Sequence, residues 1–510
     1  MRRQPLVLPC IPLVLSMSVL SLVSARDAAA QAAPTPAETQ MMPAPPVGAP
    51  GAVPEQPMPP MPPMPPMDAM PMAPMPPPPM VEALPPPPPP PPAPKATVGA
   101  KFSTDIYGFV EFDSILDSTQ SFNEIAGNNI IAKKGTFAGD HSRFTYSGRN
   151  TRLGFKFKGP DSDTVRTSAV LEADFLGNQP TGISDAALLT SPTLRVRHAM
   201  LKIETPFVDV MAGQYWQLFG WQSYFFPNSV EIMGLPGQVF GRSPQLRLSH
   251  PFKTDAVTIE VAIASSRSPQ RDGGIPDTQG GIRLLVNDWK GLHTANSTGT
   301  AVDSLGIGVS GVFRRFRVNE FAGPVASKAT NSKSAGGISV DALLPIIPAT
   351  MDSRGNALTL TGSYVRGTGI ADLFTGLTGG VKYPGLSDAT MTYTPNIDGG
   401  LVTYNPGGDL HTIDWQAFMI GAQYYLPPSG CVWISGNYTQ MNSPNMHLYA
   451  TTPATAAAAF KQSQFADGNL FWDVNKSVRL GGEFAWFKQK FVDGSTSKDL
   501  RGQFSAFYLF

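Results

Sequence analysis

The chain ends with Leu500–Phe510, LRGQFSAFYLF, a stretch in which apolar and polar residues alternate. Since neighbouring side chains of a strand point to opposite faces, this stretch predicts one apolar and one polar face. The apolar face consists of Phe504, Ala506, Tyr508 and Phe510. The polar face consists of Arg501, Gln503 and Ser505. An aromatic face for lipid and a polar face for a wet interior are typical of a transmembrane β-barrel. A soluble sandwich also alternates, but it does not need the terminal aromatic residue.

Fifteen further segments of similar pattern precede this one. With the last strand at 498–510, the others are predicted at 105–117, 143–158, 163–176, 193–204, 207–216, 244–252, 255–264, 278–286, 304–315, 336–347, 356–367, 412–425, 430–440, 468–474 and 476–490. We therefore expect an all-β chain, folded as a 16-stranded antiparallel transmembrane β-barrel. A phase change near Gly148 predicts a bulge in the second strand.

The connections between these strands separate by length. After odd-numbered strands they are mostly long, at 118–142, 177–192, 217–243, 316–335, 368–411 and 441–467, and after even-numbered strands they are mostly tight. Long loops at one end and short turns at the other are typical of a membrane barrel. The connection 287–303 follows an even-numbered strand but is too long for a tight turn, which indicates a misplaced strand boundary. If 287–303 and 368–411 concealed another strand pair, the barrel would have eighteen strands.

The first 101 residues differ in composition from the rest. Residues 1–25 combine Arg2 and Arg3 with an apolar run and small residues, which predicts a secretory signal peptide; cleavage after Ala25, Ala30 or Ala33 stays open. Residues 26–101 include the segment 34–94, which holds 29 of the 52 prolines, so we predict a disordered Pro/Met-rich periplasmic spacer. The barrel would then occupy 102–510.

Charge and histidine distribution exclude other classes of protein. Lysine plus arginine equals aspartate plus glutamate at 38 each, so no basic footprint for nucleic acid exists. The six histidines are scattered, without the spacing of a metal site or of a catalytic triad. We expect no enzymatic activity, no cofactor and no metal ion.

Four stretches of the predicted barrel carry a family resemblance. They are Tyr107–Asp113 (YGFVEFD), Arg149–Lys156 (RNTRLGFK), Gly213–Phe219 (GQYWQLF) and the terminal Phe510. In these the chain resembles the Gram-negative outer-membrane porins, most closely the DcaP-like trimeric porins. The resemblance implies a homotrimer in the outer membrane and passive uptake of small anionic solutes such as dicarboxylates. The family has a periplasmic coiled coil before the barrel, whereas this chain has only the proline-rich spacer.

Charged residues on the predicted inward faces are candidates for lining a pore. The basic ones are Arg143, Arg149, Arg152, Arg195, Arg197 and Arg247, and the acidic ones are Glu111, Asp113, Glu172 and Asp174. Arginine suits an anion pathway, because its guanidinium stays charged and offers forked donors to carboxylates. The alternative is that these arginines only neutralise the carboxylates beside them.

The connection Gln217–Ser243 is long and apolar for an external loop. It contains Trp221, Tyr224 and Phe225, together with Glu231 as a possible partner for the arginines. Folding inward would narrow the pore and make this the constriction loop. Folding outward onto the rim or a neighbouring subunit is the alternative.

The expected function is that of a passive diffusion channel, a porin, for small hydrophilic and anionic solutes such as carboxylates. The alternative is a structural outer-membrane protein whose spacer binds peptidoglycan or an envelope partner, with the barrel as its anchor. Expected partners are the lipid bilayer, two further copies of the chain and the solutes; nucleic acid is not expected.

Overall fold

The computed structural model describes residues 102–510, with gaps at 128, 161, 163, 178–189, 232–233, 270–273, 296–298, 320–329, 376–398 and 406–407. The predicted signal peptide and spacer therefore lie outside the described residues. So do the middle parts of three predicted long loops. The fold below is that of the barrel domain.

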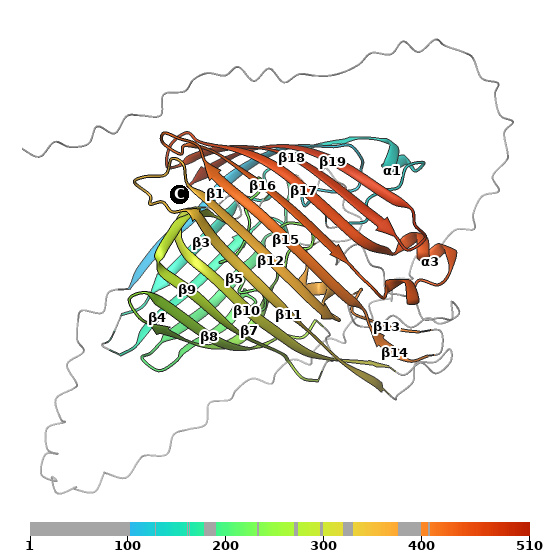
Figure 1. Ribbon diagram of the computed structural model, residues 1–510, viewed down its shortest axis with the longest axis horizontal. Helices are drawn as coiled ribbons and strands as arrows, with labels where there is room; N and C mark the ends of the chain where they lie inside the picture. The colour runs from blue at the N-terminus through green and yellow to red at the C-terminus, as the bar shows by residue number, and fades with distance from the viewer. Residues whose placement is uncertain are drawn as a thin grey trace, which may run out of the picture. The chain divides into compact units, whose positions relative to one another are not determined.

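In the described part of the chain, antiparallel strands form one closed ring (Figure 1). They are β1 (Ser103–Asp117), β2 (Arg143–Ser147), β3 (Arg152–Lys158), β4 (Arg166–Asp174), β5 (Arg195–Glu204), β6 (Asp209–Trp216), β7 (Arg242–Lys253), β8 (Val257–Ser266), β9 (Asp277–Thr294), β10 (Thr300–Asn319), β11 (Thr330–Ile347), β12 (Leu358–Thr368), β15 (Asp414–Tyr425), β16 (Val432–Asn442), β17 (Phe460–Asp473), β18 (Val478–Phe491) and β19 (Thr496–Leu509). Since β2 and β3 pair with the two halves of β1, they form a single wall strand interrupted at 148–151. The ring thus has sixteen strands, which confirms the predicted fold and places an irregularity where Gly148 predicted one.

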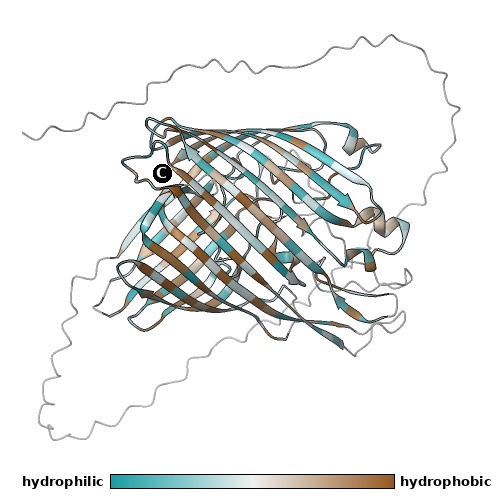
Figure 2. Cartoon of the chain, in the orientation of Figure 1, coloured by the Kyte–Doolittle hydropathy of each residue, from teal (hydrophilic) through white to brown (hydrophobic). Residues whose placement is uncertain are grey.

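The first and last strands close the ring. Phe109 pairs with Leu509 and Asp117 with Arg501 along the β1–β19 seam. On β19, Phe504 and Tyr508 are about half exposed, whereas Arg501 and Ser505 are fully buried inside. Bands of apolar and polar residues alternate along the strands in the same way (Figure 2). The alternation of LRGQFSAFYLF therefore separates a lipid-facing from an inward face, as expected for a barrel.

The described residues between the wall strands lie mostly at one end of the barrel. We call this the loop end. The opposite end, where β1 begins and β19 ends, is called the turn end. Short elements in the loop-end connections are α1 (Phe137–Asp140), η1 (Ala371–Leu373), the hairpin of β13 (Val402–Tyr404) and β14 (Leu410–Thr412), η2 (Met446–Leu448) and α3 (Pro453–Ala458). No helix among the described residues is long and apolar enough to span a membrane.

The largest errors in the predicted boundaries concern two places in the wall. Strands β9 and β10 continue through most of 287–303, so the connection is only 295–299 and belongs with the short turns. Strand β17 begins at Phe460, whereas the prediction began it at 468. The first half of the strand is polar, so the sequence pattern did not identify it, although it pairs with β16 and β18. The β13–β14 hairpin is a separate sheet outside the ring, which excludes the eighteen-stranded alternative for the described chain.

Candidate functional site

The connection between β6 and β7, residues 217–241, lies inside the barrel, and we call it the inner loop. Its base is closed by the Gln217 amide, which donates to the Gly241 carbonyl at 3.1 Å. Its first half lies on the inward faces of β9 and β10. There the Phe219 amide donates to Gln279 Oε1 at 2.9 Å and the Gly220 amide to Ser310 Oγ at 2.8 Å. These contacts fix the loop to a wall two to four strands from its base.

The second half of the inner loop reaches the opposite wall. The Asn228 carbonyl accepts from Asn437 Nδ2 on β16 at 2.7 Å, and the Val230 amide donates to Asn469 Oδ1 on β17 at 2.9 Å. Strand β6 is the fifth in the ring and β16 the thirteenth, so the loop spans half of the sixteen strands. It then returns along η1, where the Phe240 amide donates to the Leu373 carbonyl. The loop therefore crosses the barrel interior.

Aromatic side chains of the inner loop fit against glycines in the wall. Trp221 and Phe225 are buried, and Tyr224 is half-buried with its hydroxyl donating to the Ser304 carbonyl at 2.6 Å. A Cβ added to Gly308 of β10 would lie 2.7 Å from Trp221 and 2.8 Å from Phe225. Any larger residue at this position would displace the rings, so the wall glycine makes room for the loop.

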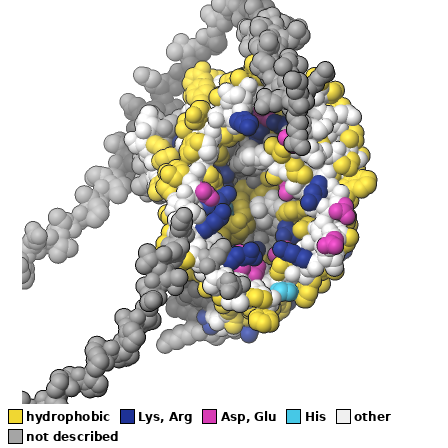
Figure 3. All heavy atoms as spheres, turned by 90° about the vertical axis from the view of Figure 1, so that its left-hand side faces the viewer, with side chains coloured by type: hydrophobic (Ala, Val, Ile, Leu, Met, Phe, Trp, Pro, Cys, Tyr) yellow, Lys and Arg dark blue, Asp and Glu magenta, His cyan; other side chains and the backbone are white. Residues whose placement is uncertain are grey.

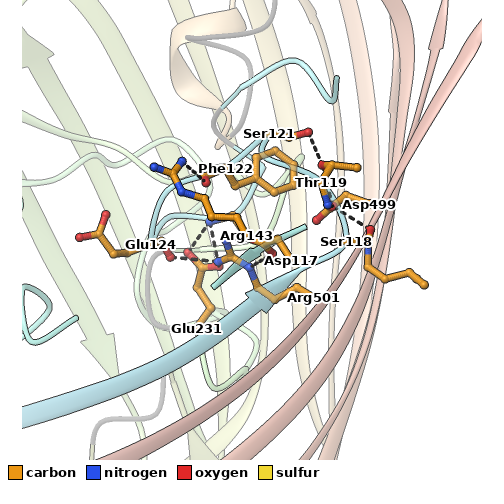
Figure 4. A network of polar contacts seen from close by, with 12 residues as sticks. Asp117, Ser118, Thr119, Ser121, Phe122, Glu124, Arg143, Glu231, Asp499 and Arg501 are labelled. Carbon is orange, nitrogen blue, oxygen red and sulfur yellow. Dashed lines mark hydrogen bonds and ion pairs between the residues drawn. The ribbon is translucent and has the colours of Figure 1, made fainter. Parts of the chain in front are cut away.

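Glu231 holds the inner loop to the β1–β19 seam (Figure 4). Its carboxylate accepts from the Ala126 amide at 2.9 and 3.0 Å and lies 3.3 Å from Arg501 Nη1. Arg501 is fully buried and also forms a bidentate pair with Asp117 at 2.7 and 2.8 Å. Burial raises the pKa of Glu231 to about 8, against the opposing effect of Arg501. One guanidinium thus links the barrel seam, the first loop and the inner loop.

Most of the predicted arginines gather on one side of the interior. The basic wall, as we name it, consists of the predicted Arg149, Arg152, Arg195, Arg197 and Arg247, with Arg242 at the start of β7. Arg195 and Arg197 share Asp174, with closest distances of 2.6 and 2.9 Å, and Arg197 also donates to Glu172 at 2.6 Å. Arg149 pairs with Glu124 at 2.8 Å, a carboxylate that sequence reasoning did not select. Neutralisation by neighbouring carboxylates therefore applies to part of this set.

Three members of the basic wall have different surroundings. Arg152 lies 3.7 Å from Glu172, and its buried Nε and Nη2 donate to no acceptor among the described residues. Arg242 lies over the Trp216 ring at 4.8 Å, with its buried Nη1 likewise unbonded in the described chain. Arg247 donates to neutral acceptors, the Trp216 carbonyl at 2.6 Å and Gln245 Oε1 at 3.0 Å. Their charges are less compensated than those of Arg195 and Arg197.

Arg143 does not join the basic wall. It lies at the loop end, where its Nη1 donates to the Phe122 carbonyl at 3.2 Å, close to the Arg501 network (Figure 4). Arg242 was missed because the sixth predicted strand, which corresponds to β7, was expected to start two residues later, at 244.

The acidic residues divide between two places. Glu172 and Asp174 of β4 pair with the basic wall, as described above. Glu111 and Asp113 of β1 take part in none of the ion pairs between described residues; Asp113 accepts from Ser505 and Gln503, and the buried Glu111 carboxylate has no hydrogen-bond partner there. The inward carboxylates that sequence reasoning did not select include Asp467 on β17 and Glu483 on β18. We call Glu111, Asp113, Asp467 and Glu483 the acidic wall.

The space beside the basic wall is open. A cavity of about 500 Å³ lies toward the turn end, lined by Arg152, Lys156, Arg197 and His198 among others. Figure 3, which looks onto this end, shows a hollow with lysine and arginine side chains around it, together with carboxylates.

The chain has structural likeness to outer-membrane channels, although no family model and no curated protein sequence matches it. The outer-membrane channel DcaP of Acinetobacter baumannii has a TM-score of 0.56 at 16% identity, covering 80% of this chain and 97% of that one. The anion-selective porin of Comamonas acidovorans has a TM-score of 0.46 at 11% identity, covering 80% and 100%. At such identities the DcaP match shows a shared fold.

Proposed function

We propose, on the premise that the chain is a barrel with the porin fold, that it is a passive diffusion channel of the outer membrane for small hydrophilic solutes. One observation carries this proposal: the inner loop crosses the interior of a closed barrel whose inward face is polar. A loop fixed to opposite walls narrows the passage, and a cavity of about 500 Å³ lies beside it toward the turn end. The inner loop, with Trp221, Tyr224, Phe225 and Glu231, is then the constriction loop.

We further propose that the channel prefers small carboxylates. The six guanidiniums of the basic wall face three carboxylates, Glu124, Glu172 and Asp174, which leaves three positive charges in excess. The acidic wall lies on β1, β17 and β18; β1 pairs with β3, which carries Arg152, whereas β5 and β7 lie farther from the acidic wall around the ring. Such a separation focuses potential at the narrow part, where low-dielectric walls reduce screening. An anion in the cavity would pass beside Arg152, which lines it and attracts the anion by its charge.

Single-channel recording of the purified full chain in a planar bilayer tests both proposals. The wild type should conduct, and the sign of its reversal potential in a salt gradient should show a preference for anions. The double change Arg152→Gln and Arg242→Gln should shift that potential toward cation preference. Arg315→Gln, on an exposed arginine of β10, is the matched control and should leave it unchanged. A silent wild type contradicts the channel, and a cation-selective wild type contradicts only the anion preference.

Assembly and orientation belong to the same proposal. We infer a homotrimer, with the N-terminal spacer in the periplasm and the loop end outside. Native mass spectrometry of the detergent-extracted protein should give three copies. A protease added to intact cells should cut the loop-end connections but not residues 26–101.

A second candidate function concerns the spacer alone. Its 29 prolines between residues 34 and 94 are more than a signal-to-barrel connection needs, which favours a tether to peptidoglycan or an envelope partner. The full chain should then sediment with peptidoglycan, and a chain lacking residues 26–101 should not. Both functions can coexist in one molecule.

A further inference from the structure

The β9–β10 hairpin extends beyond the barrel wall. Leu305 pairs with Val286, but Ser304 pairs with Lys290, so Asn287–Trp289 form a bulge at this point. Beyond the bulge, residues 290–294 pair with 300–304 in a shorter ladder. We call this ladder, together with Ala295 and Gly299 at its end, the inner hairpin. Residues 296–298 at its tip lie outside the described chain. A bulge bends and twists a strand, which allows this part to leave the direction of the wall.

The inner hairpin lies inside the barrel, against the wall opposite the basic wall. Leu292, His293 and Thr294 are almost completely buried. The Thr294 amide donates to Gln423 Oε1 of β15 and the Thr294 carbonyl accepts from Gln423 Nε2, both at 2.9 Å. Thr359 Oγ1 of β12 donates to the Leu292 carbonyl at 2.7 Å. These partners belong to inward faces, so the hairpin fills this side of the interior.

The inner hairpin also contacts the inner loop. His293 Nε2 lies 2.8 Å from the Phe226 carbonyl, which can only accept, so this nitrogen is the donor. Nδ1 of the same ring lies 2.9 Å from Asp303 Oδ2 across the hairpin. The two elements, one from each end of the barrel, thus meet in its interior.

What stays open between them lies along the basic wall. The cavity of about 500 Å³ has Ala295 and Gly299 of the inner hairpin and Phe226 of the inner loop on one side. Arg152, Lys156 and Arg197 line the other. A solute that has passed the inner loop therefore meets a second narrow passage, whose charged side is basic.

We propose that the inner hairpin is a second constriction, at the turn end, which directs permeating carboxylates past Arg152 and Lys156. The proposal deepens the proposed channel function and rests on it. Gly299 is then a specificity-determining position. A Cβ added there meets no described atom within 4 Å, and its φ is not in the left-handed region, so a side chain can be added beside the cavity without strain.

Two sets of variants test the proposal by single-channel recording. In the first, Asn-Gly replaces residues 287–304 between the paired Val286 and Leu305, since this two-residue turn suits a β-hairpin. Two similar resistances in series predict a roughly twofold rise in conductance on removing one, with reduced anion preference. Deleting Trp221–Gln238 from the inner loop should raise conductance again in the combined variant.

In the second set, Gly299→Glu, Gly299→Gln and Gly299→Lys place a negative, neutral or positive group beside the cavity. Gly299→Glu should lower the anion-to-cation permeability ratio about fivefold relative to Gly299→Gln. This factor corresponds to the repulsion between two unit charges about 4 Å apart in water. Gly299→Lys should raise it. These point variants leave the wall strands intact, so they decide the question if the hairpin replacement does not fold.

The outcomes separate the two proposals. A wild type that conducts, with equal permeability ratios for the three Gly299 variants, overturns the second constriction and leaves the channel standing. Unchanged conductance in a folded hairpin replacement does the same. A silent wild type overturns the proposed function itself.

Discussion

The inner loop and the inner hairpin both occupy the barrel interior, but their backbones are satisfied in different ways. The loop is irregular, so its amides depend on side chains of the wall, as at Gln279, Ser310 and Asn469. The hairpin continues the β9–β10 ladder and pairs most of its backbone with itself. Since buried backbone groups must be paired, the loop is held by many wall residues and the hairpin by few. Changes in the wall should therefore disturb the loop more.

Arg501→Met should give the largest effect. Removing this buried guanidinium leaves Asp117 and Glu231 without their partner, which costs about 3–5 kcal/mol. The inner loop should lose its hold on the seam, and the folded barrel should unfold at lower urea concentration. Arg315→Met, on an exposed arginine, is the control. Equal urea midpoints for the two variants would show that the network contributes little.

Gly308→Val should displace the inner loop from its first wall contact. Overpacking against Trp221 and Phe225 should cost about 1–3 kcal/mol. The shifted loop should change single-channel conductance and increase its fluctuation. Gly502→Val, where a Cβ meets no described atom within 4 Å, should leave conductance as in the wild type. The same conductance in both variants would refute the docking of the rings at Gly308.

Asn469→Leu and Gln423→Leu compare one anchor of each element. Each variant removes side-chain hydrogen bonds to a buried backbone group, which should lower the free energy of unfolding by about 1–3 kcal/mol. Amide hydrogen exchange at Val230 should accelerate more in Asn469→Leu than exchange at Thr294 does in Gln423→Leu. Thr359 and Tyr425 still hold the hairpin. The opposite order would mean that the ladder does not support the hairpin.

Glu231 should give the smallest effect, a dependence on pH. With a pKa of about 8 its carboxyl is mostly neutral at pH 7 and ionised at pH 9, which adds one negative charge to the inner loop. The reversal potential should therefore move toward cation preference as pH rises through 8, and Glu231→Gln should remove that step. Because the folded pKa is above the ordinary 4.5, this group's contribution to stability falls as pH rises from about 4.5 to 8. A step of equal size in Glu231→Gln would assign it to another group.

The sequence predicted the wall better than the interior. Alternation identified all sixteen wall strands, and it placed Arg501 on the polar face of the last one, although nothing indicated that this arginine pairs with Asp117. The inner hairpin could not be predicted, because its described residues contact protein or a wet cavity on both faces and do not alternate in polarity. Asp467 was not predicted as an inward residue, because the polar first half of β17 was not recognised as part of a strand. Pairing partners such as Glu124 depend on where loops dock, which strand periodicity does not encode.

The position of Arg501 has a consequence for the order of folding. Its pair with Asp117 joins residues 384 positions apart in the chain, so it forms only when the last strand reaches the first. Closing so long a segment carries a large loop entropy and makes this contact a late one. Because the same guanidinium holds Glu231, the inner loop receives its final anchor in the step that seals the ring. An unsealed intermediate lacks that anchor, so the passage acquires its final shape only when assembly is complete.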